Sequence, residues 1–184
     1  MKWLATPIAG LYDIQQVPTG DARGRFTRLF CEQALEGIRP GLHFTQVNLS
    51  ETTGKGTVRG MHYQSPPCAE AKLIRCLRGR VYDVAVDLRA GSPTFLQWHG
   101  VELGEDNHRA VFIPEGFAHG FQALTEDAHL LYMHTAAWSP AHERGLRHDD
   151  PRLDIAWPLP AIHLSPRDRG HALLEPDFAG VAAA

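Results

Sequence analysis

Strand periodicity is clearest in one stretch of the chain, Val81-Tyr82-Asp83-Val84-Ala85-Val86-Asp87-Leu88. Large apolar residues recur there at every second position, and Asp83, Ala85 and Asp87 share the opposite face. Such alternation is typical of a β-strand, because successive side chains point to opposite sides. A turn at Arg78-Gly79-Arg80 interrupts the run that begins at Leu73. Residues 73–88 are therefore predicted to form two strands joined by a turn.

Further strand signals surround this pair, and helical signals are few. The other predicted strands are short and separated by Gly, Pro, Asn and Asp; they cover residues 43–50, 57–63, 96–103, 110–113, 120–124 and 129–135. A short helix is predicted over 31–36, while 151–160 reads as irregular and 170–184 as a frayed end or short helix. Many short strands favour a β-sandwich or a jelly roll.

Composition excludes several classes of protein. The 184 residues suffice for one domain with a core, and a net charge of −3 gives no general attraction to nucleic acid or anionic membranes. No segment approaches the roughly 18 apolar residues that span a bilayer. Cys31, Cys68 and Cys76 are odd in number and lack a CxxC spacing, which argues against a disulfide framework. We expect a cytoplasmic protein that binds neither nucleic acid nor membrane.

Two segments place a histidine in a recognisable context. In Arg59-Gly60-Met61-His62-Tyr63-Gln64, a glycine near the histidine leaves room for a ligand to approach the backbone. The pattern Pro-x-Gly-x-x-His-Gly at residues 114–120 predicts a tight turn that directs His119, and it resembles the second motif of cupins. Metal-binding cupins pair that histidine with a His-x-His, but this chain has His62-Tyr63-Gln64. The ligand set is too small for a divalent ion, so no metal is expected.

Three further residues attract attention only together. Lys72 opens a predicted strand, Tyr132 lies within another, and Asp168 lies in Leu164-Ser165-Pro166-Arg167-Asp168-Arg169. Singly, each fits an ordinary role: a solvated lysine, a half-buried strand tyrosine, and an exposed or capping aspartate.

Longer segments carry a resemblance to a known family. They are 56–64, 72–79, 82–89, 91–95, 113–121, 143–147, 149–151 and 155–158. In this order they resemble the dTDP-4-dehydrorhamnose 3,5-epimerase family over roughly residues 20 to 170. The resemblance implies an all-β cupin jelly roll with short peripheral helices, a homodimer, no metal or cofactor, and a nucleotide-linked 4-keto sugar as substrate. Residues 1–184 would form a single domain, with 1–20 as an N-terminal arm and 170–184 as a C-terminal tail.

The resemblance also implies residue roles. His62 resembles the base that removes a proton beside the ketone, and Asp168 the partner that orients its ring. Lys72 resembles the cation that faces the enolate oxygen, and Tyr132 the acid that returns a proton from the opposite face. These residue types suit the reaction: imidazole titrates near neutrality, a carboxylate fixes its tautomer, and a fixed cation stabilises the enolate.

Seven residues are implied as substrate contacts. Arg59, His119 and Trp138 correspond to neighbours of the sugar, and Gln46 and Asn48 to contacts of the diphosphate. Arg23 and Phe26 correspond to nucleotide contacts that reach across the dimer.

Three positions depart from the family pattern. The chain has Arg28 where the family usually has Glu, Val47 where Asp is frequent, and Trp138 where Tyr is frequent. The nucleotide and the number of carbons epimerised therefore stay open. The leading reading is a 3,5-epimerase of deoxysugar or rhamnose biosynthesis. The alternatives are a single-carbon epimerase, an epimerase of another nucleotide sugar, and a non-catalytic sugar-nucleotide-binding cupin; a metal-dependent oxygenase lacks the ligands.

Overall fold

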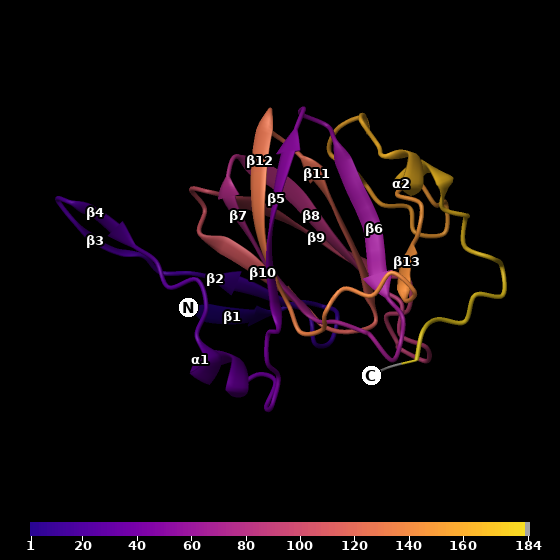
Figure 1. Cartoon of the computed structure of the whole chain (residues 1–184), viewed down its shortest axis with the longest axis horizontal. Helices are drawn as coiled ribbons and strands as arrows, with labels where there is room; N and C mark the ends of the chain where they lie inside the picture. The colour runs from indigo at the N-terminus through magenta and orange to yellow at the C-terminus, as the bar shows by residue number, and fades with distance from the viewer. Residues whose placement is uncertain (183–184) are drawn as a thin grey trace.

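Two facing sheets and one projecting hairpin make up the fold in the computed structural model, which describes residues 1–182 (Figure 1). The six-stranded sheet has the order β1 (Lys2–Ala5), β2 (Tyr12–Gln15), β10 (Arg109–Ile113), β7 (Lys72–Arg78), β12 (Asp127–His134) and β5 (Gln46–Thr53). The five-stranded sheet has the order β13 (Glu143–Gly145), β6 (Val58–Gln64), β11 (Phe117–Ala123), β8 (Arg80–Asp87) and β9 (Trp98–Gly104). All pairings within these sheets are antiparallel.

The predicted strands and the fold class are confirmed. Each stretch predicted to be a strand overlaps an observed strand, and α1 (Glu32–Glu36) falls within the predicted helix. The turn between β7 and β8 needs a glycine, because Gly79 has a φ of 70° and a side chain there would meet the carbonyl oxygen of Asp127 at 2.0 Å.

The N-terminal segment differs from the predicted arm. Of residues 1–20, β1 and β2 join the six-stranded sheet, where β2 pairs with β10. Trp3 and Tyr12 pack on the outer face of this sheet together with Phe112. These strands were missed because they are only four residues long, too short for alternation to be read. The hairpin of β3 (Thr19–Asp21) and β4 (Gly24–Phe26) then extends away from the sheets (Figure 1).

The core lies between the two sheets, at one end of the sandwich. Its members are inward-facing apolar residues of both sheets, among them Ile74, Leu103, Phe121 and Leu130. Towards the other end, inward positions carry polar side chains instead. The sandwich is therefore filled at one end and open at the other.

The chain after β13 wraps the outer face of the five-stranded sheet. Leu146, Leu153 and Leu174 are buried against Val84 and Val86 of β8. This path brings the short helix α2 (Pro166–Gly170) alongside β6 (Figure 1). Residues 170–182 of the predicted tail form no helix beyond Gly170, and Val181 makes a bridge to Arg89; residues 183–184 lie outside the described residues. Among the described residues, no helix has the length and apolar character needed to cross a bilayer.

Candidate active site

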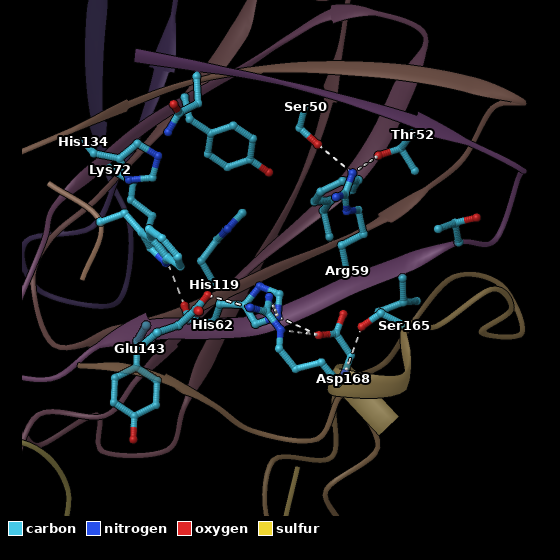
Figure 2. Close-up of a pocket in the computed structure, with 18 of the residues that line it drawn as sticks. Ser50, Thr52, Arg59, His62, Lys72, His119, His134, Glu143, Ser165 and Asp168 are labelled. Atoms are coloured by element: carbon cyan, nitrogen blue, oxygen red, sulfur yellow. Dashed lines mark hydrogen bonds and ion pairs between the residues drawn. The ribbon is translucent and has the colours of Figure 1, made fainter. Parts of the chain in front are cut away.

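A cavity of about 950 Å³ opens between the sheets at their polar end. Strands β5, β7 and β12 form one wall, β6 and β11 form the other, and the segment of α2 lies at the edge (Figure 2). All four residues implied as catalytic line it: His62, Lys72, Tyr132 and Asp168. The two sheets and α2 thus bring together residues that are up to 106 positions apart in the sequence.

His62 and Asp168 form a hydrogen-bonded pair. The Nε2 atom of His62 lies 2.8 Å from Oδ1 of Asp168, whose side chain is only 4% exposed. The position of Asp168 is set by the helix start: Ser165 is the N-cap of α2, and its hydroxyl accepts the backbone N–H of Asp168 at 3.0 Å. With Nε2 held by the carboxylate, the other ring nitrogen, Nδ1, is the one left to accept a proton.

Asp168 is held in its charged form. Burial opposes ionisation, but the hydrogen bonds from His62 and from the backbone N–H of Gly60 outweigh it and lower the pKa of Asp168 to about 2. The carboxylate is therefore ionised at neutral pH, and it can stabilise the imidazolium that forms when His62 takes a proton.

Gly60 has a different role from the one expected. A side chain at Gly60 would meet the Cα of Gly120 at 2.5 Å, and its φ is 133°. The missing side chain therefore allows β6 to approach β11 closely, rather than leaving space for a ligand. It also aims the backbone N–H of Gly60 at Asp168, at 3.3 Å.

The surroundings of the pair resemble a metal-ligand cluster only in part. Nitrogen and oxygen atoms of His62, Asp168 and His171 lie within 4.8 Å of one another. However, the guanidinium of Arg167 lies 3.1 Å from the same Nε2 of His62. A cation already faces the atom that a metal would need, so these residues fit a divalent ion poorly.

A second His–Asp pair lies deeper in the cavity. Nε2 of His119 lies 2.9 Å from Oδ2 of Asp83 on β8, and the two side chains are 6% and 1% exposed. Burial lowers the pKa of His119, although the charge of Asp83 opposes this. A neutral imidazole on this wall can exchange hydrogen bonds with a bound sugar.

Tyr132 stands on the wall opposite His62. Its ring contacts His119 edge to face at a centroid distance of 5.8 Å, and His119 pairs with His62 in the register of β6 and β11. Burial and the charge of Asp83 raise the pKa of Tyr132 well above its usual value. The phenol therefore keeps its proton at neutral pH, as a proton donor must.

Lys72 is the cation of the same wall. It is 6% exposed and pairs with Glu70, with Nζ and Oε1 3.2 Å apart. Glu70 in turn accepts a hydrogen bond from Nδ1 of His134 at 2.9 Å. Chemically, the cavity offers a base and an acid on opposite walls with a fixed cation beside them, which suits removal and return of a proton next to a carbonyl.

Comparisons with known proteins agree with this geometry. Residues 5–176 match the family model described as dTDP-4-dehydrorhamnose 3,5-epimerase. The chain belongs to the dTDP-4-dehydrorhamnose 3,5-epimerase family. The family expectation from the sequence is thereby confirmed.

Relatives within the family are named for different activities. The dTDP-4-dehydrorhamnose 3,5-epimerase of Pseudomonas aeruginosa is 47% identical over 86% of this chain and 88% of its own. The dTDP-4-dehydrorhamnose 3-epimerase of Streptomyces niveus is 40% identical over 91% of this chain and 81% of its own. A crystal structure of dTDP-6-deoxy-D-glucose-3,5-epimerase from Legionella pneumophila, in complex with dTDP-4-keto-L-rhamnose, superposes with a TM-score of 0.92 at 39% identity, covering 100% of this chain and 99% of that chain.

Most residues implied as substrate contacts line the cavity of this epimerase-family chain. They are Gln46, Asn48, Arg59, His119 and Trp138. Arg59 is held by the hydroxyls of Ser50 and Thr52, at 2.9 and 3.1 Å (Figure 2). Arg23 and Phe26 lie instead on the projecting β3–β4 hairpin, outside this cavity, where Arg23 pairs with Asp21.

The departures from the family pattern fall in different places. Trp138 lines the cavity, and its backbone N–H donates to the side chain of Gln46. Val47 is 59% exposed and does not line the cavity, whereas its neighbours Gln46 and Asn48 do. Arg28 is exposed just after the hairpin. Within one chain, only Trp138 therefore alters the cavity of this epimerase-family member.

Several cavity residues escaped the sequence analysis. They are Glu70, His134, Glu143 and Arg167, with Asp83 behind His119. Asp83 had one available signal, because it is a carboxylate within the strand whose alternation is clearest in the sequence. The other four can be assigned to the site only from their contacts with residues on other strands. Those contacts depend on strand pairing, which the sequence alone does not give.

Proposed function

We propose that this protein inverts carbons adjacent to the ketone of a nucleotide-linked 4-keto-6-deoxy sugar, as in conversion of dTDP-4-dehydro-6-deoxyglucose to dTDP-4-dehydrorhamnose. The observation that carries the proposal is the placement of His62 and Tyr132 on opposite walls of one cavity, with Lys72 on the same wall as Tyr132. His62 removes the proton at Nδ1, Asp168 stabilises the resulting imidazolium, Lys72 faces the enolate oxygen, and Tyr132 returns a proton from the other face.

The test is solvent exchange in deuterium oxide. The wild type should incorporate deuterium beside the ketone. In His62→Ala the exchange rate should fall by roughly 10²–10⁴-fold, as expected when a general base is removed. Tyr132→Phe should retain exchange better than inversion, because it keeps the base and loses the acid. Undiminished exchange in His62→Ala would refute the base assignment, and no exchange in the wild type with any nucleotide sugar would leave the binding-protein alternative standing.

One carbon or two can be distinguished in the same experiment. Two deuterons per product indicate 3,5-epimerisation, and one indicates a single-carbon enzyme such as the Streptomyces niveus relative's name describes. Comparing dTDP-, CDP-, GDP- and UDP-linked substrates identifies the nucleotide. Trp138→Tyr then tests whether the indole, which has no titrating hydroxyl, sets the number of carbons.

The assembly we propose is a homodimer. Val47, Leu49 and Leu77 expose apolar surface, with exposed fractions of 59%, 56% and 41%. Nearby, Arg75 is buried although its Nε and one terminal nitrogen have no hydrogen-bond partner among the described residues. The β3–β4 hairpin would carry Arg23 and Phe26 to the nucleotide in the partner's cavity.

Mixing two inactive variants tests this assembly. One protomer carries Phe26→Ala and its partner carries His62→Ala. Because each hairpin reaches the partner's cavity, a mixed dimer has both defects in one cavity and none in the other, so activity should reappear on mixing. Activity that stays absent, with a monomer in sedimentation, would contradict the homodimer.

The compartment we propose is the cytoplasm. The free thiols of Cys31, Cys68 and Cys76 support a reducing compartment, and cell fractionation checks this.

A further inference from the structure

Glu70 joins the two strands that carry the cation and the acid. Lys72 of β7 and His134 of β12 are direct partners in the antiparallel register. Two basic side chains placed opposite each other would repel if both were charged. The carboxylate of Glu70 lies between them, with Oε1 3.2 Å from Nζ of Lys72 and Oε2 2.9 Å from Nδ1 of His134.

The backbone fixes this carboxylate in place. The N–H of Ala71 donates to the hydroxyl of Thr135 at 2.8 Å, and the N–H of Thr135 donates to the carbonyl of Ala71 at 3.1 Å. His134 lies opposite Lys72 in the antiparallel register, and Glu70 precedes Lys72 by two residues, so one carboxylate contacts both side chains. The side chains of Glu70 and Lys72 are similarly buried, with exposed fractions of 9% and 8%.

A buried ammonium needs such a partner. Removing an isolated charge from water costs several kcal/mol, and a lysine without compensation loses its proton instead. Among the described residues, Glu70 is the one carboxylate that pairs with Lys72; the other close contact is the carbonyl oxygen of His62, at 3.3 Å. Burial opposes the ionisation of Glu70, but His134 and Lys72 lower its pKa, so the partner is charged.

The same carboxylate reaches the acid through His134. The rings of His134 and Tyr132 stack at 5.8 Å with an interplanar angle of 15°. A charged Glu70 requires a proton on Nδ1 of His134, which fixes the tautomer and the plane of that ring. The phenol of Tyr132 lies against this plane.

We propose that Glu70 is a positioning residue of the site: it keeps Lys72 protonated and, through His134, holds the plane against which Tyr132 stacks. This inference rests on the proposed function for its catalytic meaning, although the pairing itself does not. Glu70 would thus link Lys72, the cation that faces the enolate oxygen, to Tyr132, the proton donor.

Other titratable groups face the same space, and all of them except His134 remain in every variant used below. They are His62 on β6, His119 on β11 with Asp83 on β8, and Tyr132 and His134 on β12. None of these supplies a second carboxylate within ion-pair distance of Lys72 among the described residues.

Lysine titration tests the pairing without turnover. The chain contains only Lys2, Lys55 and Lys72, and the first two are exposed. Protein labelled with ¹³C at lysine Cε therefore gives three signals, which Lys2→Arg and Lys55→Arg assign. In Glu70→Gln, Lys72 should lose its proton about one pH unit or more below the wild type, while the two exposed lysines stay unchanged. A Lys72 midpoint that does not move would overturn the inference.

The pH profile of deuterium exchange tests the catalytic meaning. Because the protonated lysine is the active form, the alkaline limb of kcat/KM should move to lower pH in Glu70→Gln, and Glu70→Asp should restore part of it. A purely structural defect would lower the rate equally at all pH values, and that result would contradict the proposal. Glu105→Gln, an exposed carboxylate outside the cavity lining, is the matched control.

His134 separates the two halves of the claim. His134→Phe keeps a flat ring beside Tyr132 but removes the hydrogen bond to Glu70, so the alkaline limb should remain near its wild-type position. His134→Ala removes the plane and should lower inversion more than exchange. Equal loss in both variants would contradict the role of the stack. If the wild type exchanges no deuterium at all, the proposed function fails, while the lysine titration still decides the pairing.

Discussion

The two His–Asp pairs of the cavity share a composition and differ in surroundings. His62 is 25% exposed at the cavity edge, and its partner Asp168 accepts a second hydrogen bond from a backbone N–H. His119 is 6% exposed, and one oxygen of its partner Asp83 has no hydrogen bond among the described residues. The outer pair lies where a substrate in the cavity can reach the imidazole, whereas burial lowers the pKa of the inner imidazole and favours its neutral form.

This contrast shows that a residue pair does not define a role by itself. A carboxylate beside an imidazole stabilises the charged ring only if the ring is solvated enough, or paired well enough, to accept the charge. His62 satisfies this condition. Its ring is partly exposed, and α2 places the carboxylate of Asp168, which also accepts the backbone N–H of Gly60, beside it. In the inner pair, desolvation wins, and His119 is suited to hydrogen bonding rather than to proton abstraction.

The largest expected effect comes from breaking the outer pair. Asp168→Asn keeps the shape but cannot stabilise an imidazolium on His62, so kcat for exchange should fall by roughly 10²–10⁴-fold. The double variant with His62→Ala should be no slower than His62→Ala alone, because the aspartate acts through the histidine. A single variant that keeps a tenth of the wild-type rate would contradict this role.

Breaking the inner pair should mainly affect folding. His119→Leu leaves the carboxylate of Asp83 buried without a partner on either oxygen, which should lower the free energy of unfolding by about 3–5 kcal/mol. Urea denaturation at neutral pH measures the change. Adding Asp83→Asn removes the stranded charge and should recover part of it. A loss below about 1 kcal/mol would show that Asp83 finds another partner or a proton.

Sequence alone anticipates one member of each pair and the strands that carry it. His62 and His119 stand in local motifs, and the alternation in residues 81–88 fixes β8. Asp168 is reached only through family resemblance, because 106 residues separate it from His62 and no local pattern joins them. Four-residue strands such as β1 and β2 are missed for a related reason: pairing with each other, and of β2 with β10, stabilises them more than any pattern of their own.

The smallest effect separates the pairs by pH. The pKa of His119 is below its usual 6.5, so the unfolded chain binds a proton more readily, and stability falls as pH drops below about 6.5. The pKa of Asp168 falls from 3.8 to about 2, so its contribution of about 2 kcal/mol is present above about pH 4 and disappears towards pH 2. The difference in unfolding free energy between wild type and His119→Asn should therefore change with pH below about 6.5. The difference between wild type and Asp168→Asn should change between about pH 4 and pH 2. Both differences changing in one common window would mean that the two pairs titrate as a single unit.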